Sequence, residues 1–419
     1  MARANQSEPL PDLSHAEWLS RPATRAVFSA LAAGGAEARA VGGAVRNALM
    51  GTPVKDVDIA TPALPADVMR LAAEAGLHPV PTGLEHGTVT VVAQHIPFEV
   101  TTLRRDVEGF GRHARVTFTT DWTEDARRRD FTMNALYCSA EGVVHDPLGG
   151  YADLQARRVR FIGDPHERIR EDYLRTLRFF RFLAEYGNAA APDPEGLAAT
   201  IAEKSGLSGL SGERIRAELL LLLAAPGAVA AVRTMREAAL LEPVLGTPGN
   251  AEQLARIAAI EATLGRPPDP VLRLAALALD GSQSPADLQQ RLRLSAAETA
   301  RLTHAAAKDR AFDPQTEEPE AQAFIYRKGA QAFLDGALMD WAGSREAIDA
   351  TSRIERARLI ERWQAPELPV RGADVLARGV QAGPGVGRVI AAFETWWIAE
   401  GYPSDPKKVA DKLDELVRD

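Results

Sequence analysis

The chain has 419 residues, of which 46% are hydrophobic and 25% charged, and it carries a net charge of −8. This length exceeds a single compact core, so we expect two or more domains of a globular protein. No apolar run reaches the roughly 18 residues of a spanning helix, and the only cysteine, Cys138, excludes an intrachain disulfide framework and a cysteine-based zinc site.

The N-terminal segment carries Glu8, Asp12 and Glu17 and has no apolar stretch, so it is unlike a signal or transit peptide. Together with the single cysteine, this predicts a cytoplasmic location. The spacing of Ser14 and Glu17 is typical of a capping box and predicts the start of a first helix. We therefore place an N-terminal extension and this helix in residues 1–22.

Residues 23–155 alternate between helical and strand patterns. Asp56 to Ile59, Thr88 to Ala93 and Phe98 to Thr102 are strand candidates. Beyond this region strand patterns largely vanish, and helix starts recur at positions such as Ser284 and Ser295. The sequence thus predicts an α+β fold with a mixed α/β head in residues 23–155, followed by helical segments 156–250 and 251–419.

The first motif is the run VGGAVR at positions 41–46, which is followed by two aspartates, Asp56 and Asp58. Paired glycines such as Gly42 and Gly43 ahead of a helix let backbone N–H groups approach an anion. Arg46 would then clamp a phosphate oxygen. The bland alternative is an ordinary turn.

Strand alternation predicts that Asp56 and Asp58 share one face, with Val57 and Ile59 on the other. Adjacent carboxylates repel each other unless a cation neutralises them, as a pair of Mg²⁺ ions does in nucleotidyl transfer. A lone pair of this kind is more often solvent-facing, but its position after the glycine motif favours a metal site. Glu99 is a candidate third catalytic carboxylate, with a solvated strand glutamate as the alternative.

The second motif is the run RRDFTMNA at positions 128–135. Arg129 supplies donors for phosphates, and Asp130 and Asn134 supply partners for ribose hydroxyls. The alternative is a basic loop that leads into a capped helix.

The third motif places Glu171, Asp172 and Arg175 at helical spacings that predict one shared face, with Arg178 and Arg181 beyond. An aspartate accepts a hydrogen bond from an exocyclic amine, and an arginine donates to base acceptors, so this face would read a nucleobase. The alternative is a solvated i,i+4 ion pair. The segment 157–181 holds eight arginines and four acidic residues, and this local positive charge is compatible with RNA despite the overall negative charge.

In this order, the three motifs resemble class II tRNA nucleotidyltransferases, the bacterial CCA-adding enzymes and their poly(A) polymerase relatives. The resemblance covers about Ala40 to Phe182. It implies a polymerase-β-like head followed by a helical neck, body and tail. It also implies Mg²⁺ as cofactor, with Asp56 and Asp58 as its ligands. The remaining roles that it implies concern the nucleotide: triphosphate contacts from Gly43 and Arg46, ribose and phosphate contacts from Arg129, Asp130 and Asn134, and base templating by Asp172 and Arg175 with help from Arg178 and Arg181.

Two details refine the resemblance. The segment from Arg104 to Asp125, with Gly109 to His113 inside it, is similar to the flexible loop that enzymes adding only CC lack. The sequence departs from the family pattern at Asn47, where an aspartate is usual, and we expect a weakened contact there rather than loss of activity.

The predicted substrates are CTP and ATP, and the predicted partner is tRNA, held by its acceptor end and TΨC arm. We expect neither a membrane nor an obligate protein partner. Three alternatives remain at this point: a poly(A) polymerase, a catalytically silent RNA-binding protein on the same scaffold, and a nucleotidyltransferase for a small molecule or protein.

Overall fold

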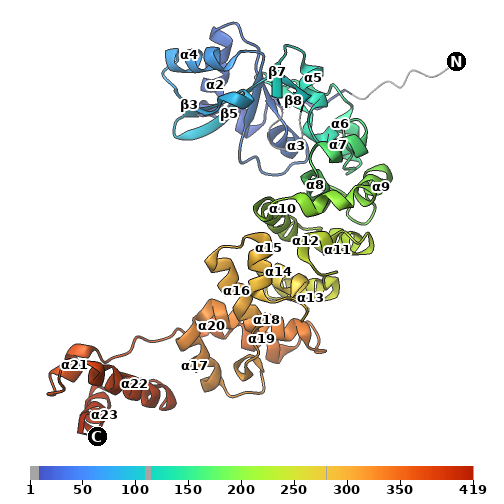
Figure 1. Ribbon diagram of the computed structural model, residues 1–419. Helices are drawn as coiled ribbons and strands as arrows, with labels where there is room; N and C mark the ends of the chain where they lie inside the picture. Colours follow the sequence, from blue (N-terminus) through green and yellow to red (C-terminus); the bar gives the residue numbers. More distant parts are fainter. Residues whose placement is uncertain (1–8, 109–114, 280, 419) are drawn as a thin grey trace. The chain divides into compact units, whose positions relative to one another are not determined.

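A computed structural model describes residues 9–108, 115–279 and 281–418 of the chain. The chain divides into two compact units, residues 1–249 and 250–419 (Figure 1). The first unit holds a sheet followed by helices, and the described part of the second unit is helical. The predicted α+β fold, with a mixed sheet in the head and a helical remainder, is confirmed.

A seven-stranded mixed sheet forms the centre of the head, in the order β3-β4-β5-β2-β1-β8-β9. Strand β2 pairs with β5 in parallel, and the other neighbouring pairs are antiparallel. The strands are β1 (Arg39–Val41), β2 (Asp58–Thr61), β3 (His78–Gly83), β4 (Thr88–Ala93), β5 (Ile96–Thr102), β8 (Tyr137–Ser139) and β9 (Val144–His145). The strands predicted at positions 88–93 and 98–102 are confirmed, whereas the strand predicted from Asp56 begins only at Asp58.

Helices accompany this sheet. In the first unit up to residue 155 they are α1 (Glu17–Ser20), α2 (Pro22–Ala33), α3 (Gly43–Leu49), α4 (Pro65–Glu74), α5 (Trp122–Arg127) and α6 (Gly150–Gln155), with short 3₁₀ turns η1 (Leu84–His86) and η2 (Thr132–Asn134). Helices α2 and α4 pack against each other and against β4, and they bury Val27, Leu31 and Val68. The capping box predicted at Ser14 was wrong, because the Ser14 hydroxyl donates to Asp12 at 3.0 Å and Ala16 precedes α1 instead.

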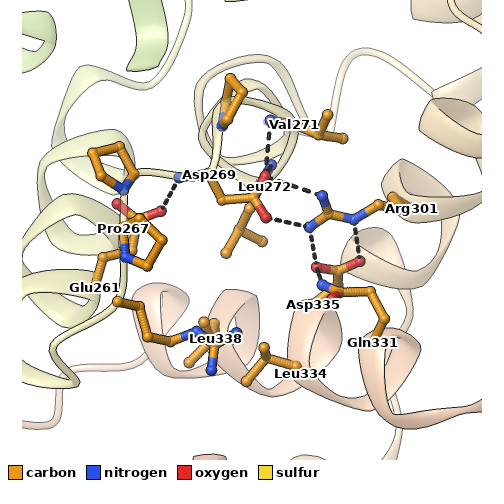
Figure 2. Close-up of a pocket in the computed structure, with 13 residues that line it drawn as sticks. Glu261, Pro267, Asp269, Val271, Leu272, Arg301, Gln331, Leu334, Asp335 and Leu338 are labelled. Atoms are coloured by element: carbon orange, nitrogen blue, oxygen red, sulfur yellow. Dashed lines mark hydrogen bonds and ion pairs between the residues drawn. The ribbon is translucent and has the colours of Figure 1, made fainter. Parts of the chain in front are cut away.

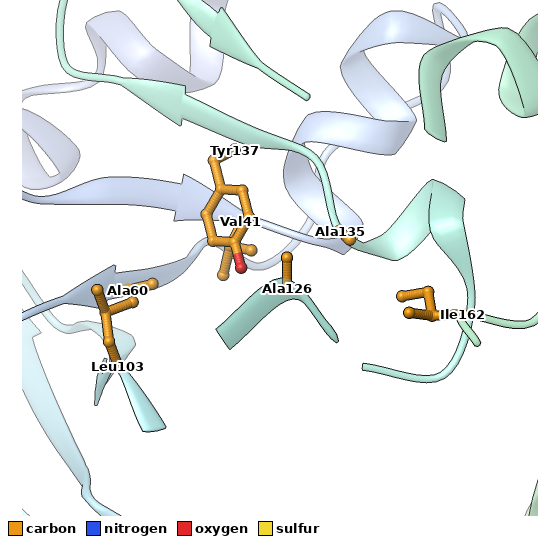
Figure 3. Packing of buried hydrophobic residues seen from close by; sticks show 7 residues of the cluster. All are labelled: Val41, Ala60, Leu103, Ala126, Ala135, Tyr137 and Ile162. Atoms are coloured by element: carbon orange, nitrogen blue, oxygen red, sulfur yellow. The ribbon is translucent and has the colours of Figure 1, made fainter. Parts of the chain in front are cut away.

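Buried side chains from several elements form a core cluster of the head (Figure 3). Val41 of β1, Ala60 of β2 and Tyr137 of β8 meet there with Ala126 of α5. Tyr137 is fully buried, so its ring fixes the ends of three adjacent strands relative to α5. This packing holds rigid the strand ends that carry the candidate site residues.

A second sheet, of two strands, lies in the segment predicted to be a flexible loop. Strands β6 (Arg104–Glu108) and β7 (Arg115–Phe118) pair in antiparallel fashion. The predicted loop residues Gly109 to His113 lie outside the described residues. Part of this segment is therefore a regular hairpin rather than an irregular loop.

The remainder of the first unit is helical. It contains α7 (Pro165–Glu171), α8 (Leu174–Glu185), α9 (Pro194–Ala202), η3 (Lys204–Gly209), α10 (Gly212–Ala224), α11 (Ala228–Glu237) and α12 (Leu241–Leu245). Helix α8 docks on the head through aromatic rings. Phe179 stacks on Phe161 with centroids 5.5 Å apart, and Phe182 lies 5.0 Å from Phe131. This packing brings the polar face of α8 next to the 128–135 motif.

The second unit contains α13 (Ala251–Thr263), α14 (Pro270–Ala278), α15 (Pro285–Leu292), α16 (Ala296–Ala306), η4 (Arg310–Phe312), α17 (Glu318–Lys328), α18 (Ala330–Gly343), α19 (Thr351–Ala357), α20 (Leu359–Arg362), α21 (Gly372–Leu376), α22 (Pro384–Ala399) and α23 (Pro406–Arg418). The helix starts predicted at Ser284 and Ser295 are confirmed, and both serines form complete capping boxes. Buried rings of Phe312 and Phe333 anchor one core cluster, and Phe393 and Trp397 anchor another.

Candidate active site

The register of three adjacent strands places the predicted carboxylates together. Val41, the last residue of β1, lies opposite Asp58, the first residue of β2. Ile59 is level with Val100 in the parallel β2–β5 pair, so Asp58 and Glu99 occupy neighbouring positions on the same face. Asp56 precedes the strand by two residues, and both aspartates are exposed while Val57 and Ile59 are buried. The predicted alternation therefore holds even though Asp56 lies outside the strand.

Asp58 lies in a strongly perturbed electrostatic environment. Protein atoms crowd the carboxylate although it remains open to solvent at the pocket mouth, and this desolvation is the largest contribution to its shift. Together with the nearby charges of Glu99 and Asp56, it raises the pKa of Asp58 to about 6, against a smaller opposing effect of Arg129. Excess negative charge of this kind favours a cation beside the carboxylate.

The glycine turn after β1 requires its glycine. Gly42 has φ 68° and ψ −118°, a conformation that L side chains rarely adopt. Its backbone N–H donates to the carbonyl of Leu136 at 3.1 Å. The Nη1 atom of Arg129 lies 3.8 Å from where a Cβ on Gly42 would be. The turn is thus fixed to the residue that precedes β8 and lies close to a guanidinium, as a phosphate site requires.

Arg46 of α3 turns its guanidinium into the head instead of toward bulk solvent. Its Nη1 donates to Oδ1 of Asn134 at 2.5 Å, and its Nε and Nη2 donate to Oδ1 of Asn47 at 3.2 and 3.0 Å. The side chain is 6% exposed, and this burial lowers the pKa of Arg46. Asn47, the departure from the family pattern, therefore contacts Arg46 directly.

A buried carboxylate that the sequence analysis missed anchors Arg129. Asp125 of α5 accepts from Nη2 of Arg129 at 3.0 Å, from Nε of Arg128 at 2.8 Å and from the hydroxyl of Tyr137 at 2.8 Å. Burial raises the pKa of Asp125, but the guanidinium groups of Arg129 and Arg128 outweigh it and bring the pKa to about 2. The acidic residue four positions before Arg129 was the available sequence signal.

Asp130 and Asn134 form hydrogen bonds within the protein. Oδ1 of Asp130 accepts from Nδ2 of Asn134 at 2.8 Å, and Oδ2 accepts from Nε and Nη2 of Arg178 at 2.9 and 2.5 Å. Nη1 of Arg178 also reaches Glu218 of α10 at 3.2 Å. Burial opposes ionisation of Asp130, but these donors win and hold its pKa below the usual value. Arg178 of α8 thereby ties the neck to the head.

The prediction that Glu171, Asp172 and Arg175 share one helix face was wrong in its geometry. Helix α7 ends at Glu171, and Asp172 is extended with φ −155°. Asp172 accepts from the backbone N–H of Leu174 at 3.2 Å and from Nη2 of Arg214 at 2.7 Å. The helix is interrupted here, and the Asp172 carboxylate caps the next helix, α8, by accepting from its first backbone N–H. Arg175 nevertheless forms the i,i+4 ion pair with Glu171.

Most of the predicted residues meet in one pocket of about 370 Å³. The pocket is lined by Gly42, Gly43, Arg46, Asp58, Arg129, Asp130, Asn134, Asp172, Arg175, Arg178 and Phe182. Of the other predicted residues, Asp56 and Glu99 lie near Asp58 without lining this pocket. Arg181 also lies outside, where it pairs with Glu218 at 2.6 Å. Phe182 was not predicted as a site residue, and its place in an aromatic run made it indistinguishable from core.

Metal binding depends on the donor set around Asp58. In the parts of the chain that the structure describes, no three acidic, histidine or cysteine side chains are already arranged around a metal position. The chemistry of Asp58 still fits a divalent cation, because desolvation and then the like charges of Glu99 and Asp56 raise its pKa, and a cation would relieve that repulsion.

Another pocket, of about 300 Å³, lies in the second unit (Figure 2). Its polar groups are engaged with each other: Arg301 bridges Asp269 and Asp335 at 2.7 and 2.6 Å. Asp269 also caps α14 through the N–H groups of Val271 and Leu272. This network joins α14, α16 and α18 and has a structural explanation.

Comparison with known proteins identifies the class of protein to which the chain belongs. Residues 38–160 match the family of the poly A polymerase head domain, and residues 191–254 match the family described as the probable RNA and SrmB-binding site of polymerase A. The mitochondrial CCA tRNA nucleotidyltransferase 1 of Danio rerio is 33% identical, with 90% of this chain and 87% of that protein covered. The CCA-adding enzyme of Lacticaseibacillus paracasei is 30% identical, with 94% and 96% covered.

Among solved structures, the CCA-adding enzyme of Bacillus stearothermophilus in complex with CTP is 29% identical and superposes with a TM-score of 0.73, covering 95% of this chain and 98% of that one. The chain belongs to the family of CCA tRNA nucleotidyltransferases, also called CCA-adding enzymes. Within the described residues, none of the helices is long and apolar enough to cross a membrane.

Proposed function

We propose that this protein adds C, C and A to the 3′ end of tRNA, using CTP and ATP without a nucleic-acid template. The observation that carries the proposal is the single pocket in which Asp58, the Gly42 turn and Arg46 lie with Asp172 and Arg175. Groups suited to phosphates and groups suited to a base edge thus line the same space. One nucleotide carries both a triphosphate and a base edge, so a single ligand would use both sets of groups.

In the reaction, the tRNA 3′-oxygen forms a bond to the α-phosphorus of the nucleotide, and the bond to the β-phosphate oxygen breaks. Pyrophosphate and one proton are released. We assign the triphosphate to Gly42, Gly43, Arg46 and Arg129, since backbone N–H groups and guanidinium groups bind phosphate oxygens. These contacts would orient the α-phosphorus toward the attacking oxygen.

Asp56 and Asp58 would hold Mg²⁺, with Glu99 as the third carboxylate of the site. When bound, the metal would polarise the attacking hydroxyl and neutralise the triphosphate charge. The chain itself places Asp58 and Glu99 on the neighbouring strands β2 and β5, with Asp56 in the segment that leads into β2. The raised pKa of Asp58 supports this assignment, because a cation would stabilise the charged form of a desolvated carboxylate.

For base selection, we assign Asp172 as acceptor and Arg175 as donor toward the Watson–Crick edge. Both CTP and ATP offer an exocyclic amine to Asp172, whereas UTP offers a carbonyl that an aspartate repels. Arg178 supports this site from the same helix. Asp130 and Asn134 would meet the ribose, and Arg181, which lies outside the pocket, would act only through Glu218.

We assign catalysis to residues 23–155, base selection and part of RNA binding to residues 156–250, and tRNA binding to residues 251–419. The match of residues 191–254 to an RNA-binding family supports the second assignment. For the third, tRNA held by its acceptor end and TΨC arm is the expected ligand. We also propose a cytoplasmic location. Relatives from zebrafish, mouse and human are named mitochondrial, and cell fractionation would decide the compartment.

The test is an extension assay on tRNA transcripts that end before CCA, after C and after CC, with each nucleotide supplied singly. We expect C on the first two ends and A only on the third. Because residues 38–160 match a poly A polymerase head, poly(A) polymerase is the second candidate. Addition of A to every end would establish that alternative, and no addition to any end would favour a silent RNA-binding protein.

A further inference from the structure

Arg46 is a buried cation whose hydrogen-bond partners are uncharged. It is 6% exposed, and its three donor groups all reach amide oxygens, those of Asn47 and Asn134. Among the described residues, no carboxylate forms an ion pair with it. Burying a guanidinium without a counter-charge is costly. Arg46 also lines the pocket, so an anionic ligand bound there would supply the counter-charge that the protein does not.

Tyr186 lies against the same guanidinium. The centroid of its ring is 3.8 Å from the Cζ atom of Arg46, and the ring of Phe182 is 5.2 Å away. Both rings come from α8 and its C-terminal cap, four residues apart. An aromatic face attracts a cation without neutralising its charge. The ring thus holds Arg46 while leaving its charge available.

The ring itself is held firmly. The hydroxyl of Tyr186 donates to Glu185 at 2.7 Å, and the ring packs 5.4 Å from that of Phe182. Tyr186 is only half-buried, whereas Phe182 is buried and contacts Phe131 in the core. Substitution of Tyr186 is therefore the change that removes the ring with the least damage to the fold.

We propose that Tyr186 is a positioning residue for nucleotide binding, whose ring holds the guanidinium of Arg46 in place to pair with the triphosphate. The inference rests on the proposed function of this pocket. Since the ring stacks on Arg46, which is assigned to the triphosphate, it should act equally on CTP and ATP.

The experiment compares Tyr186→Leu and Tyr186→Phe with wild type in steady-state extension of tRNA ending before CCA and after CC. Loss of a desolvated cation–π contact should raise the nucleotide KM of Tyr186→Leu about tenfold for both nucleotides. Tyr186→Phe keeps the ring and should remain close to wild type. The KM for tRNA should stay unchanged. Tyr151→Leu is the matched control, because Tyr151 is a half-buried tyrosine of α6 outside the pocket.

A double-mutant cycle with Arg46→Gln separates positioning from general destabilisation. If the ring acts through Arg46, Tyr186→Leu should cause no further rise in KM in the Arg46→Gln background. An equal rise in both backgrounds, or a fall in kcat with unchanged KM, would overturn the proposal.

Calorimetric titration with inorganic tripolyphosphate provides a readout that does not need tRNA. Tyr186→Leu should weaken tripolyphosphate binding about tenfold as well, and binding equal to wild type would overturn the role of Tyr186. A wild-type protein that binds tripolyphosphate but extends no tRNA would instead overturn the proposed function, so the two failures are distinguishable.

Discussion

Two aspartates of the head, Asp58 and Asp125, lie in different electrostatic environments that suit them to different roles in the site. Asp58 lies among other carboxylates, and its pKa rises to about 6. Asp125 lies between two arginines, and its pKa falls to about 2. The first is therefore suited to gain a cation, and the second is a permanent anion that fixes Arg129 in place.

Replacing either Asp56 or Asp58 by alanine should abolish addition of both C and A. Both carboxylates are assigned to the metal, and removal of one charge-stabilising group typically costs about a hundredfold or more in rate. Circular dichroism should show an unchanged fold, since both side chains are exposed. Near-normal rates with Mg²⁺ in either variant would mean that the metal site is elsewhere.

The Asp125 network predicts a defined pH dependence of stability. Because the folded pKa is lowered, the stabilising effect is complete above the unfolded pKa of 3.8 and is lost as pH falls toward about 2. The shift corresponds to about 2 kcal/mol of unfolding free energy at neutral pH. Urea unfolding at several pH values would measure it. The free energy of unfolding should be higher for the wild type than for Asp125→Asn, and this difference should shrink between pH 4 and pH 2. A difference that stayed constant with pH would contradict the assignment.

At the scale of elements, the break between α7 and α8 shapes the base-reading side of the pocket. In a continuous helix, Asp172 and Arg175 would lie on the same face, three residues apart. The break instead leaves Asp172 extended, where it caps α8 and meets Arg214 of α10. Glu218 of α10 also pairs with Arg178 and Arg181 at 3.2 and 2.6 Å. Helix α10 therefore supports the polar face of α8 from behind.

Asp172→Ala and Arg175→Ala should change nucleotide preference beyond slowing the reaction. Each good contact to a base edge contributes roughly 1–3 kcal/mol of discrimination. Asp172→Ala should bring kcat/KM for UTP or GTP about tenfold or more closer to that for CTP. The measurement is kcat/KM for all four nucleotides on tRNA that ends before CCA.

Loss of the α8 cap would also lower the stability of Asp172→Ala, but a ratio between nucleotides does not respond to the amount of folded enzyme. Asp58→Ala is the comparison variant, because any residual activity that it keeps should be reduced equally for every nucleotide. Equal losses for all four nucleotides in the Asp172 and Arg175 variants would show that the break is structural.

For the whole molecule, the distribution of charge matters more than the net value of −8. Seven of the eight arginines between positions 157 and 181 form ion pairs with acidic side chains. This stretch is therefore a weaker RNA-binding surface than its composition predicted. In the second unit, Lys308 and Arg310 line a hollow of about 560 Å³ together with Arg353 and three aspartates, Asp309, Asp313 and Asp340. Within the described residues, neither Lys308 nor Arg310 takes part in an ion pair.

Binding of tRNA should weaken steeply with salt despite the net negative charge. Cations that contact phosphates release counterions, so we expect a loss of about tenfold or more between about 50 and about 200 mM salt. Replacing both Lys308 and Arg310 by alanine should reduce the slope of log Kd against log salt by about one to two. Filter binding over a salt series would measure both, and a flat response of the wild type would favour a substrate other than RNA.

The sequence by itself determined the fold class and most members of the pocket, although it missed Phe182 and placed Asp56, Glu99 and Arg181 in the site without their lining the pocket. Local signals sufficed for the strands at 88–93 and 98–102, because apolar and polar residues alternate along each strand and this alternation predicts which side chains are buried. The motifs around Gly42, Asp58, Arg129 and Asp172 were recognisable because each keeps its chemistry within a few positions. Most of these residues do line one pocket.

Only the tertiary structure decided how those residues are held. Asp125, Tyr186 and Arg214 contact motif residues, but only Asp125 left a local signal, its spacing four positions before Arg129. No local pattern distinguishes Tyr186 and Arg214 from ordinary surface or core residues. The break at Asp172 also escaped prediction, because helical spacing continues through it and one partner of the Asp172 carboxylate, Arg214, lies 42 positions away. Sequence periodicity reports which residues a local element buries, whereas partners of buried charges come from whatever element folds against them.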